Sequence, residues 1–352
     1  MSAKPFAERV LQWFDAHGRH DLPWQRPRSA YRVWVSEIML QQTQVATVIP
    51  YFTRFMARFP DVATLAAAPL DDVLAHWSGL GYYARARNLH ACAQGVANGL
   101  GGEFPRTVEG CLALPGIGRS TAGAIVSQAF DARAPILDGN VRRVLARHAA
   151  LHGWPGTPAV SKAFWALAES RLPEARYADY TQALMDLGAT CCTARRPQCL
   201  LCPVQEDCLA RQQGSVASLP TPKPRRARPR KQAQVLVVEN HDGEILLARR
   251  PQRGIWGGLW SLPVIMAGDA WPSGLDALQP FDNTPLTPIA HSFTHFDLQM
   301  DPVHLQGQPA VNDDLIWHAP TQALTLGLPA PIRRMIEQRV AHTAATTTPE
   351  AS

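Results

Sequence analysis

Four cysteines near the middle of the chain have the spacing of metal ligands. Cys192, Cys199, Cys202 and Cys208 form a C-x6-C-x2-C-x5-C run. Thiolates this close together can surround one metal centre, and all-sulfur ligation suits either zinc or an iron–sulfur cluster. Disulfide pairing is the alternative, but the N-terminal sequence MSAKPFAERVLQWFDAHGRH has no apolar signal core, so we expect reduced thiols. The run therefore predicts a metal site, with the adjacent Cys191 as a spare thiol.

A glycine-rich turn between two helical patterns has the composition of a phosphate-binding element. The segment LPGIGRSTAGAIVSQAF covers residues 114–130 and follows the short helical pattern TVEGCLA. Pro115, Gly116 and Gly118 allow a tight turn, and a helix starting near Arg119 would present free backbone N–H groups to a phosphate. A plain helix–turn–helix connection without a ligand is the alternative. The L-P-G-x-G form resembles the helix-hairpin-helix DNA-binding element, here residues 107–130.

Two carboxylates lie in contexts that suit acid catalysis or charge stabilisation. Glu37 stands in the apolar helical segment VWVSEIML, where burial would raise its pKa and let it act as a general acid. The alternative is a glutamate on the wet side of an amphipathic helix. Gln41 is expected one turn further on the same face. Asp138 precedes the helical pattern NVRRVLAR, so either Asp138 or Asn140 caps that helix, or Asp138 lies in a DNA cleft.

Composition and periodicity indicate two domains of different class. The 352 residues are 46% apolar, with a net charge of +5 and a pI near 8.9, which leans mildly towards an acidic partner. No stretch reaches membrane-spanning length. The proline-rich, basic residues 213–231 predict an extended linker. Helical patterns precede it and include Cys92 and Cys111 as predicted core residues; strand patterns follow it.

The elements are predicted from these two periodicities. Helices are expected over residues 7–17, 31–59, 69–80, 120–130, 140–151 and 331–340. Strands are expected over 233–240 and 244–251, joined by a turn at 241–243. The tail 343–352 is expected to be disordered.

Six segments taken together resemble the MutY family of adenine DNA glycosylases, within the endonuclease III superfamily. They are LPWQ (22–25), SEIMLQQTQV (36–45), GLGYYARARNL (79–89), LPGIGRSTAGAI (114–125), LDGNVRRVLAR (137–147) and MDLGATCC (185–192). The resemblance runs from about residue 5 to the end of the second domain. It implies a multidomain chain with an all-α helix-hairpin-helix glycosylase domain (1–212), a 4Fe–4S cluster loop (192–208), the linker 213–231 and an α/β Nudix-like domain (232–342).

The resemblance also implies chemical roles for individual residues. Glu37 would protonate a flipped-out adenine at N7, and Asp138 would stabilise positive charge on the sugar. Asn140 would help to hold the site. Ser120 occupies the position where strand-cleaving relatives carry a catalytic lysine, so the resemblance implies an enzyme that removes the base without cutting the strand. Cys192, Cys199, Cys202 and Cys208 match the ligands of a 4Fe–4S cluster.

Contacts with DNA follow from the same resemblance. Gln42 and Tyr82 match residues that wedge into the duplex at the lesion, and Gln41 lies beside the first of them. Without the resemblance, residues 79–90 form an ordinary polar helix. The substrate implied is double-stranded DNA with adenine opposite 8-oxoguanine or guanine. The expected protein is a monomer in the cytoplasm, associated with the nucleoid and not with a membrane.

The second domain resembles the Nudix fold through its strand–turn–strand start and the segment GIWGGLWSLP. After Pro263 it lacks the R-E-x-x-E-E set of a Nudix hydrolase. Phe293, Thr294 and His295 fall where the family usually has a Phe-Ser-His loop that senses the oxidised base; otherwise they form a surface hairpin. Two other functions stay open: a non-catalytic iron–sulfur DNA-binding protein, and a nucleotide pyrophosphatase acting through this domain.

Overall fold

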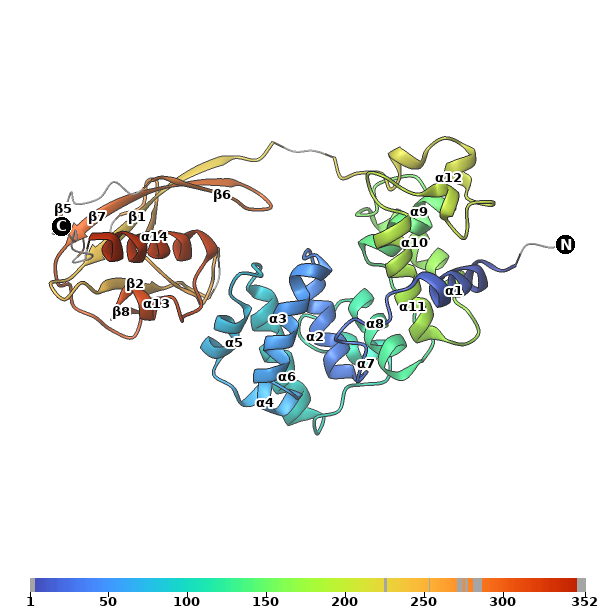
Figure 1. Cartoon of the computed structure of the whole chain (residues 1–352), viewed down its shortest axis with the longest axis horizontal. Helices are drawn as coiled ribbons and strands as arrows, with labels where there is room; N and C mark the ends of the chain where they lie inside the picture. Colours follow the sequence, from blue (N-terminus) through green and yellow to red (C-terminus); the bar gives the residue numbers. More distant parts are fainter. Residues whose placement is uncertain are drawn as a thin grey trace, which may run out of the picture. The chain divides into compact units, whose positions relative to one another are not determined.

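The chain divides into two compact units (Figure 1). The computed structural model describes residues 4–224, 227–252, 254–270, 275, 278–280 and 287–346. Unit 1 comprises residues 1–67 and 88–225, and unit 2 comprises residues 68–87 and 226–352. The segment 68–87 therefore packs with the C-terminal part of the chain, although the sequence placed it inside the first domain.

The regular elements of unit 1 are all helices within its described residues. Its main helices are α1 (Phe6–His17), α2 (Ala30–Leu40), α3 (Val45–Arg58), α4 (Val62–Ala67), α6 (Ala84–Gly99, which begins in unit 2), α7 (Val108–Leu112), α8 (Arg119–Phe130), α9 (Gly139–His148), α10 (Pro158–Ser170), α11 (Tyr177–Asp186) and α12 (Leu209–Gln212).

The helix expected over residues 31–59 is two helices. α2 ends at Leu40 and α3 begins at Val45, because Gln42 adopts a left-handed φ of 59° that an α-helix cannot contain. The apolar period continues across the break, which is why the sequence pattern read as one helix. The loop that results, residues 41–44, lies at the candidate site.

One apolar core packs α8 and α9 against α1, α10 and α11. The side chains of Val141, Leu145, Phe164, Tyr180 and Ala183 are at most 1% exposed and belong to one cluster formed by α1 and α8–α11. Each large buried side chain contributes about 1.5–3 kcal/mol relative to exposure. Cys92 and Cys111 are fully buried, as expected for core residues.

The chain between α11 and the linker has little regular helix. A π-helical turn covers Leu187–Cys191, and a short 3-10 turn covers Cys199–Leu201. A second 3-10 turn, Val216–Ser218, lies within the predicted linker. At Gly188 a Cβ would lie 2.6 Å from the Cβ of Asn140. Only glycine therefore lets the π-helical turn approach the start of α9 this closely.

Unit 2 contains a mixed sheet whose order is β3-β2-β1-β7-β5, with β4 beside β1, β6 beside β7 and β8 beside β2. β1 and β7 run parallel in register from Arg230↔Asp297 to Glu239↔Gln306, and the other described strand pairs are antiparallel. The strands are β1 (Arg230–Glu239), β2 (Ile245–Arg249), β3 (Trp260–Ser261), β4 (Val264–Met266), β5 (Gln279–Pro280), β6 (Ile289–Ser292), β7 (Asp297–Gln306) and β8 (Leu315–His318).

Three helices of the described residues lie entirely in unit 2: α5 (Leu70–Trp77), α13 (Pro320–Ala323) and α14 (Ala330–Thr346). α14 lies along the sheet in Figure 1, and Arg339 on it pairs with Glu239 of β1 at 2.7 Å. The expected strands and final helix are present, although α14 continues to Thr346, into the segment expected to be disordered. Residues 347–352 of that segment lie outside the described residues.

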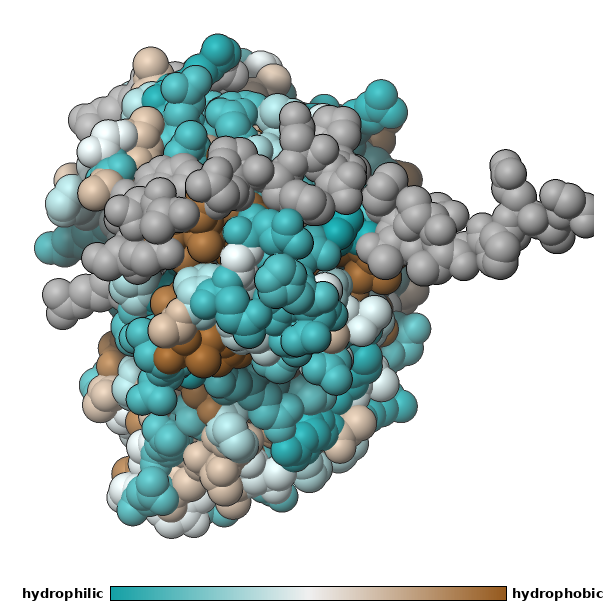
Figure 2. Space-filling view, turned by 90° about the vertical axis from the view of Figure 1, so that its left-hand side faces the viewer, coloured by the Kyte–Doolittle hydropathy of each residue, from teal (hydrophilic) through white to brown (hydrophobic). Residues whose placement is uncertain are grey.

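The surface drawn in Figure 2 is that of a chain whose apolar residues lie mainly inside. The face drawn in Figure 2 is mainly hydrophilic, with small hydrophobic groups between. Within the described ranges, no helix is both long enough and apolar enough to span a membrane.

Candidate active site

A cavity of about 830 Å³ in unit 1 collects the predicted catalytic residues. It lies where the loop after α2, the N-termini of α8 and α9, and the end of α11 meet. Predicted residues in its wall are Glu37, Gln41, Gln42, Ser120, Asp138 and Asn140. Residues that sequence reasoning missed, including Arg19, Arg143, Gln182 and Gly188, complete the wall. The cavity is large enough for a nucleobase with its sugar.

Glu37 is a carboxyl held largely in its protonated form. It lies on α2, whose first turn is capped by the Ser29 side chain accepting from the Arg32 N–H. Burial raises the pKa of Glu37 to about 8, the nearby charge of Asp138 adds to the increase, and a hydrogen bond from Gln128 opposes it. That bond, from Gln128 Nε2 to Glu37 Oε1, is 3.4 Å long. At neutral pH Glu37 can therefore donate a proton into the cavity.

Asp138 fulfils both roles that the sequence left open. Its Oδ1 accepts the N–H of Val141 at 2.7 Å and caps α9, while its side chain also lines the cavity. Burial raises the pKa of Asp138, and the Val141 N–H together with the positive charge of Arg143 holds the increase down. Glu37 and Asp138 are thus two carboxyls of one cavity in different environments, which is the arrangement that separates an acid from a stabilising carboxylate.

Ser120 joins α8 to the segment that carries Asp138. Its Oγ accepts the backbone N–H of Leu137 at 3.0 Å. Ser120 does not cap α8, since Gly118 is the N-cap residue and makes no side-chain bond. The serine therefore holds the chain just before Asp138 instead of closing its own helix.

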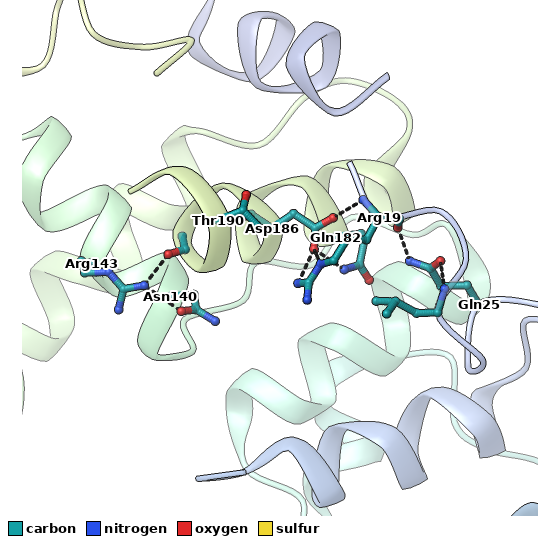
Figure 3. Close-up of polar contacts among 9 residues, drawn as sticks. Arg19, Gln25, Asn140, Arg143, Gln182, Asp186 and Thr190 are labelled. Carbon is teal, nitrogen blue, oxygen red and sulfur yellow. Dashed lines mark hydrogen bonds and ion pairs between the residues drawn. The ribbon is translucent and has the colours of Figure 1, made fainter. Parts of the chain in front are cut away.

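Arg143 connects the start of α9 with the chain after α11, and its bond to Asn140 is drawn in Figure 3. Its Nη2 donates to Asn140 Oδ1 at 2.8 Å and to the carbonyl of Gly188 at 2.5 Å. Its Nε donates to the carbonyl of Cys192 at 2.7 Å. Asn140 is thereby fixed by an arginine three residues later. The NVRR sequence contains both Asn140 and Arg143, but nothing in it indicated that the two side chains pair.

Arg19, in the wall of the cavity, forms an ion pair with the buried Asp186 (Figure 3). Arg19 donates to both oxygens of Asp186 from its backbone N at 2.7 Å and from its guanidinium at 2.6 and 2.9 Å. Gln182 Nε2 also donates to Asp186, at 2.8 Å. This bond orients the amide so that Gln182 Oε1 is buried without a hydrogen-bond partner in the described structure. A buried acceptor of this kind is open to a donor from a ligand or from an ordered water.

The cysteine run surrounds a second, smaller cavity. Cys192, Cys199, Cys202 and Cys208 line it together with Cys191. Among the described residues, no group of three or more His, Cys, Asp or Glu is arranged round a single metal ion. Arg147 of α9 donates to Cys192 Sγ at 3.4 Å and to the carbonyl of Thr193 at 2.7 Å. Four thiols round a shared space with a cation beside them fit an iron–sulfur cluster.

The hairpin between α7 and α8 is exposed where a phosphate would bind. Pro115, Gly116, Gly118 and Arg119 are all exposed, and α8 begins directly after them. Gly116 has a φ of 75°, and a Cβ there would lie 2.7 Å from Asn88. The turn therefore requires glycine. The Ile117 N–H donates to the Leu114 carbonyl at 3.3 Å, and the exposed start of α8 offers backbone N–H groups to an anion.

Gln41 and Gln42 lie at the mouth of the first cavity. Gln41 lies one turn beyond Glu37 as the C-cap residue of α2, and its ψ of 112° ends the helix there. Both glutamines are exposed and line the same cavity as Glu37. The left-handed φ of 59° at Gln42 turns the chain away from α2.

Unit 2 carries the remaining predicted DNA contacts. Tyr82 is 51% exposed and has a φ of 48°, following Gly79 and Gly81 at 101° and 69°. Such a φ costs a non-glycine residue about 1–2 kcal/mol. The predicted sensing loop joins β6 to β7, and its turn is closed by the Phe293 N–H donating to the Phe296 carbonyl at 2.8 Å.

Comparisons with known proteins agree over nearly the whole chain. Residues 35–170 match the HhH-GPD superfamily of base excision DNA repair proteins, residues 192–208 the iron–sulfur binding domain of endonuclease III, and residues 234–338 the NUDIX domain. An adenine DNA glycosylase of Buchnera aphidicola (from Acyrthosiphon pisum) is 35% identical over 340 residues, which are 94% of this chain and 97% of that protein. The chain belongs to the adenine DNA glycosylase family. A rat adenine DNA glycosylase is 40% identical and covers 88% of this chain and 72% of its own length.

Solved structures agree with the fold of this adenine DNA glycosylase. A thermostable thymine-DNA glycosylase covers 59% of the chain and 95% of its own, with 28% identity and a TM-score of 0.54. A non-covalent endonuclease III–DNA complex, at 23% identity, covers 59% of this chain and 94% of its own with a TM-score of 0.50 and shows the fold alone.

Family membership confirms the main expectations from the sequence. The chain is a base-excision-repair adenine DNA glycosylase with a helix-hairpin-helix domain, an iron–sulfur domain and a C-terminal Nudix domain. Its substrate is DNA, as for the family. The alternative of a non-catalytic iron–sulfur DNA-binding protein is wrong.

Proposed function

We propose that this adenine DNA glycosylase removes adenine opposite 8-oxoguanine or guanine and leaves the DNA strand intact. The observation that carries the proposal is the pairing of Glu37 and Asp138 in one cavity. One carboxyl has its pKa raised to about 8, and the other is held by a helix N-terminus and a neighbouring arginine. These are the two groups that breaking an N-glycosidic bond requires.

Glu37 would act as the general acid. Adenine is a poor leaving group as an anion, so it must gain a proton as the bond to the sugar breaks. A buried, protonated carboxyl supplies that proton, and such catalysis contributes about 10²–10⁴-fold. Asp138 would stabilise the positive charge that develops on the sugar, with Asn140 and Ser120 fixing its surroundings.

Gln182 supports recognition of adenine in the same cavity. Its buried Oε1 has no partner in the described structure, and the exocyclic amino group of adenine is a donor. A base with a carbonyl at that position would leave the acceptor unpaired against another acceptor. A site built in this way discriminates strongly between donors and acceptors.

The cavity favours base removal without strand cleavage. Strand cleavage usually needs an amine that forms a Schiff base with the opened sugar. The cations among the described lining residues are Arg19 and Arg143, and an arginine is too basic for that role. Ser120, at the position of the lysine in strand-cleaving relatives, cannot form an imine.

DNA would be held by the hairpin and by two wedge residues. Residues 115–119 would bind a phosphate through N–H groups at the start of α8. Gln42 and Tyr82 would enter the duplex at the mispair, with Gln41 beside the first. Flipping the adenine costs a few kcal/mol, least for a mispaired base. Phe293, Thr294 and His295 would contact the base opposite adenine.

The cluster would be held by Cys192, Cys199, Cys202 and Cys208. A bound 4Fe–4S cluster would cross-link the irregular segment after α11, which has little core of its own. The proposed domains are 1–212, with its hairpin at 107–130, and 232–342, joined by residues 213–231. Two features modify these bounds: residues 68–87 pack in unit 2, and β1 already begins at Arg230. We further propose a monomer that works on nucleoid DNA in the cytoplasm.

A strand-cleavage assay tests the proposal. Labelled duplexes with adenine opposite 8-oxoguanine, guanine or thymine are incubated with the enzyme and analysed with and without hot alkali. We expect alkali-dependent cleavage for the first two and little for the third, with no adduct after borohydride trapping. Cleavage without alkali together with a trapped adduct would refute monofunctional chemistry. Hydrolysis of 8-oxo-dGTP, measured in parallel, would instead support the pyrophosphatase alternative.

A further inference from the structure

One turn of unit 2 contacts both segments that are proposed to meet the lesion. The ring of Trp256 lies 5.6 Å from the ring of Phe293 in the sensing loop. The carbonyl of the next residue, Gly257, accepts a hydrogen bond from the guanidinium of Arg87. Arg87 belongs to the segment that presents Tyr82. Neighbouring residues of a single turn thus make a ring contact with the sensing loop on one side and accept a hydrogen bond from the wedge segment on the other.

The turn has a fixed conformation. Trp256 has a left-handed φ of 58° and is 9% exposed. A Cβ on Gly257 would clash with the backbone oxygen of Gln252. The Gly258 N–H donates to the Arg250 carbonyl at 3.1 Å. A displacement of Trp256 would therefore move the Gly257 carbonyl with it.

A second contact holds the wedge segment to the same part of unit 2. The hydroxyl of Tyr83 donates to the carbonyl of Leu328 at 2.8 Å, and Leu328 is fully buried. The preceding Gly327 packs so closely that a Cβ there would lie 3.1 Å from Leu74 and 3.3 Å from Leu259. Leu259 follows the Trp256–Gly257 turn, so both contacts converge on one structure.

In the sequence, Tyr82 shortly precedes Tyr83 and Arg87, the residues that make these two contacts. Its exposed ring is 5.6 Å from the guanidinium carbon of Arg85, which is also 5.4 Å from the ring of Trp77. Arg85 donates to the carbonyl of Gly81 at 3.3 Å. Because Tyr82 holds a strained φ, its conformation depends on the neighbours that fix the turn.

We propose that the Trp256–Gly257 turn couples the Phe293–His295 loop to the Tyr82 wedge, with Arg87 and Tyr83 as positioning residues. Contact of the loop with the base opposite adenine would then favour insertion of Tyr82 at the same mispair. The inference rests on the proposed function, since it takes Tyr82 as a wedge and the loop as the sensor. It adds the physical connection between them.

The test measures insertion without chemistry. The duplex carries 2′-fluoro-2′-deoxyadenosine opposite 8-oxoguanine, because the fluorine destabilises positive charge on the sugar and blocks base release. 2-Aminopurine next to the 8-oxoguanine becomes brighter when a wedge unstacks it. The signal from full-length, cluster-containing protein at saturating concentration gives the ratio of inserted to uninserted complex.

Arg87→Met and Phe293→Leu are combined in a double-mutant cycle. Each single change should lower the insertion ratio by about three- to tenfold, the range for one lost contact. If the turn couples the two residues, the insertion ratio of the double variant should be only slightly lower than that of whichever single variant inserts less. An insertion ratio equal to the product of the two single effects, or unchanged singles, would overturn the coupling.

Three further variants keep the test decisive. Tyr83→Phe removes only the hydroxyl and replaces Arg87→Met in the cycle if that variant does not fold. Tyr31→Phe is the matched control, because Tyr31 also donates to a backbone carbonyl, that of Phe59 at 2.7 Å, within unit 1; a loss equal to that of Tyr83→Phe would contradict the proposal. Tyr82→Leu should abolish the signal. A signal that survives it would instead show that the wedge assignment itself is wrong.

Discussion

The Ser120 hydroxyl accepts a hydrogen bond from the Leu137 backbone N–H at 3.0 Å. This bond fastens the second helix of the hairpin to the residue just before Asp138. The element proposed to hold the DNA phosphate and the carboxylate proposed to face the sugar are therefore one assembly, although Ser120 and Leu137 are 17 positions apart in the sequence.

Ser120→Ala should weaken both stability and catalysis. The Leu137 N–H would lose its partner, which costs about 1–3 kcal/mol for a buried group, and Asp138 would be less well held. We expect a lower midpoint in urea unfolding and a several-fold slower single-turnover excision. Ser120→Thr keeps the hydroxyl and is the control; equal losses in both variants would mean that the bond is not the cause.

Long-range contacts of this kind explain which parts of the site could be predicted from the sequence. Some features are local patterns in the sequence: the hairpin, the start of α8 at Arg119 and the cysteine run. Turn-forming residues and spacing were therefore sufficient to predict them. The pairing of Arg19 with Asp186 joins residues 167 positions apart, and no local pattern marks it. The resemblance to a family brought Asn140 into the site, whereas its partner Arg143 required coordinates.

The break after Leu40 and the packing of residues 68–87 in unit 2 could not be predicted from the sequence, for similar reasons. A left-handed φ at Gln42 interrupts an apolar period that continues through α3, so periodicity alone gave one long helix. Residues 68–87 have ordinary helical patterns, and only their contacts, such as Tyr83 with Leu328, assign them to unit 2. Patterning reports which face of a helix is buried, not which partner buries it.

Excision should depend on pH as a bell-shaped curve. The rate should rise as Asp138 ionises, above a pKa that burial raises from its ordinary value. It should fall above a pH of about 8, where Glu37 loses its proton. Single-turnover rates between pH 5 and 10 measure both limbs. A rate that stays constant up to pH 9 would contradict the proposed role of Glu37 as the proton donor.

The same carboxyl should make stability depend on pH. The folded pKa of Glu37, about 8, lies above its unfolded value of 4.5, so the folded state binds the extra proton between these values. The free energy of unfolding should therefore be highest below pH 4.5 with respect to this group and decrease as pH rises to about 8. Urea titrations at several pH values measure how the free energy of unfolding changes with pH. This dependence should be weaker in Glu37→Gln, and an unchanged dependence would contradict the raised pKa.

Cys199→Ser should reduce cluster content, and Cys191→Ser should not. Both thiols line the same cavity, but only Cys199 belongs to the C-x6-C-x2-C-x5-C run. The purified parent protein should be brown and contain iron and sulfide, while Cys199→Ser should be paler and give less folded protein. Iron analysis and visible absorbance check this. Stoichiometric zinc in a colourless parent protein would replace the iron assignment.

Thr294→Val should weaken the preference for 8-oxoguanine over guanine. Thr294 is exposed at the tip of the β6–β7 turn, so its hydroxyl is free to meet DNA without a folding cost. Loss of one hydrogen bond should reduce the ratio of the two excision rates by about three- to tenfold. Thr294→Ser should keep the ratio. If Val and Ser variants discriminate equally well, the hydroxyl does not read the lesion.

Glu37→Gln tests the proposed chemistry most directly, because glutamine keeps the shape of the side chain but cannot donate the proton. Single-turnover release of adenine opposite 8-oxoguanine and equilibrium binding of the same duplex are measured for the parent and the variant. We predict that binding changes less than about threefold, while release falls by at least about 10²-fold, the lower value for a general acid. Release within a few-fold of the parent rate would contradict the assignment of Glu37 as the acid, and with it the proposed mechanism.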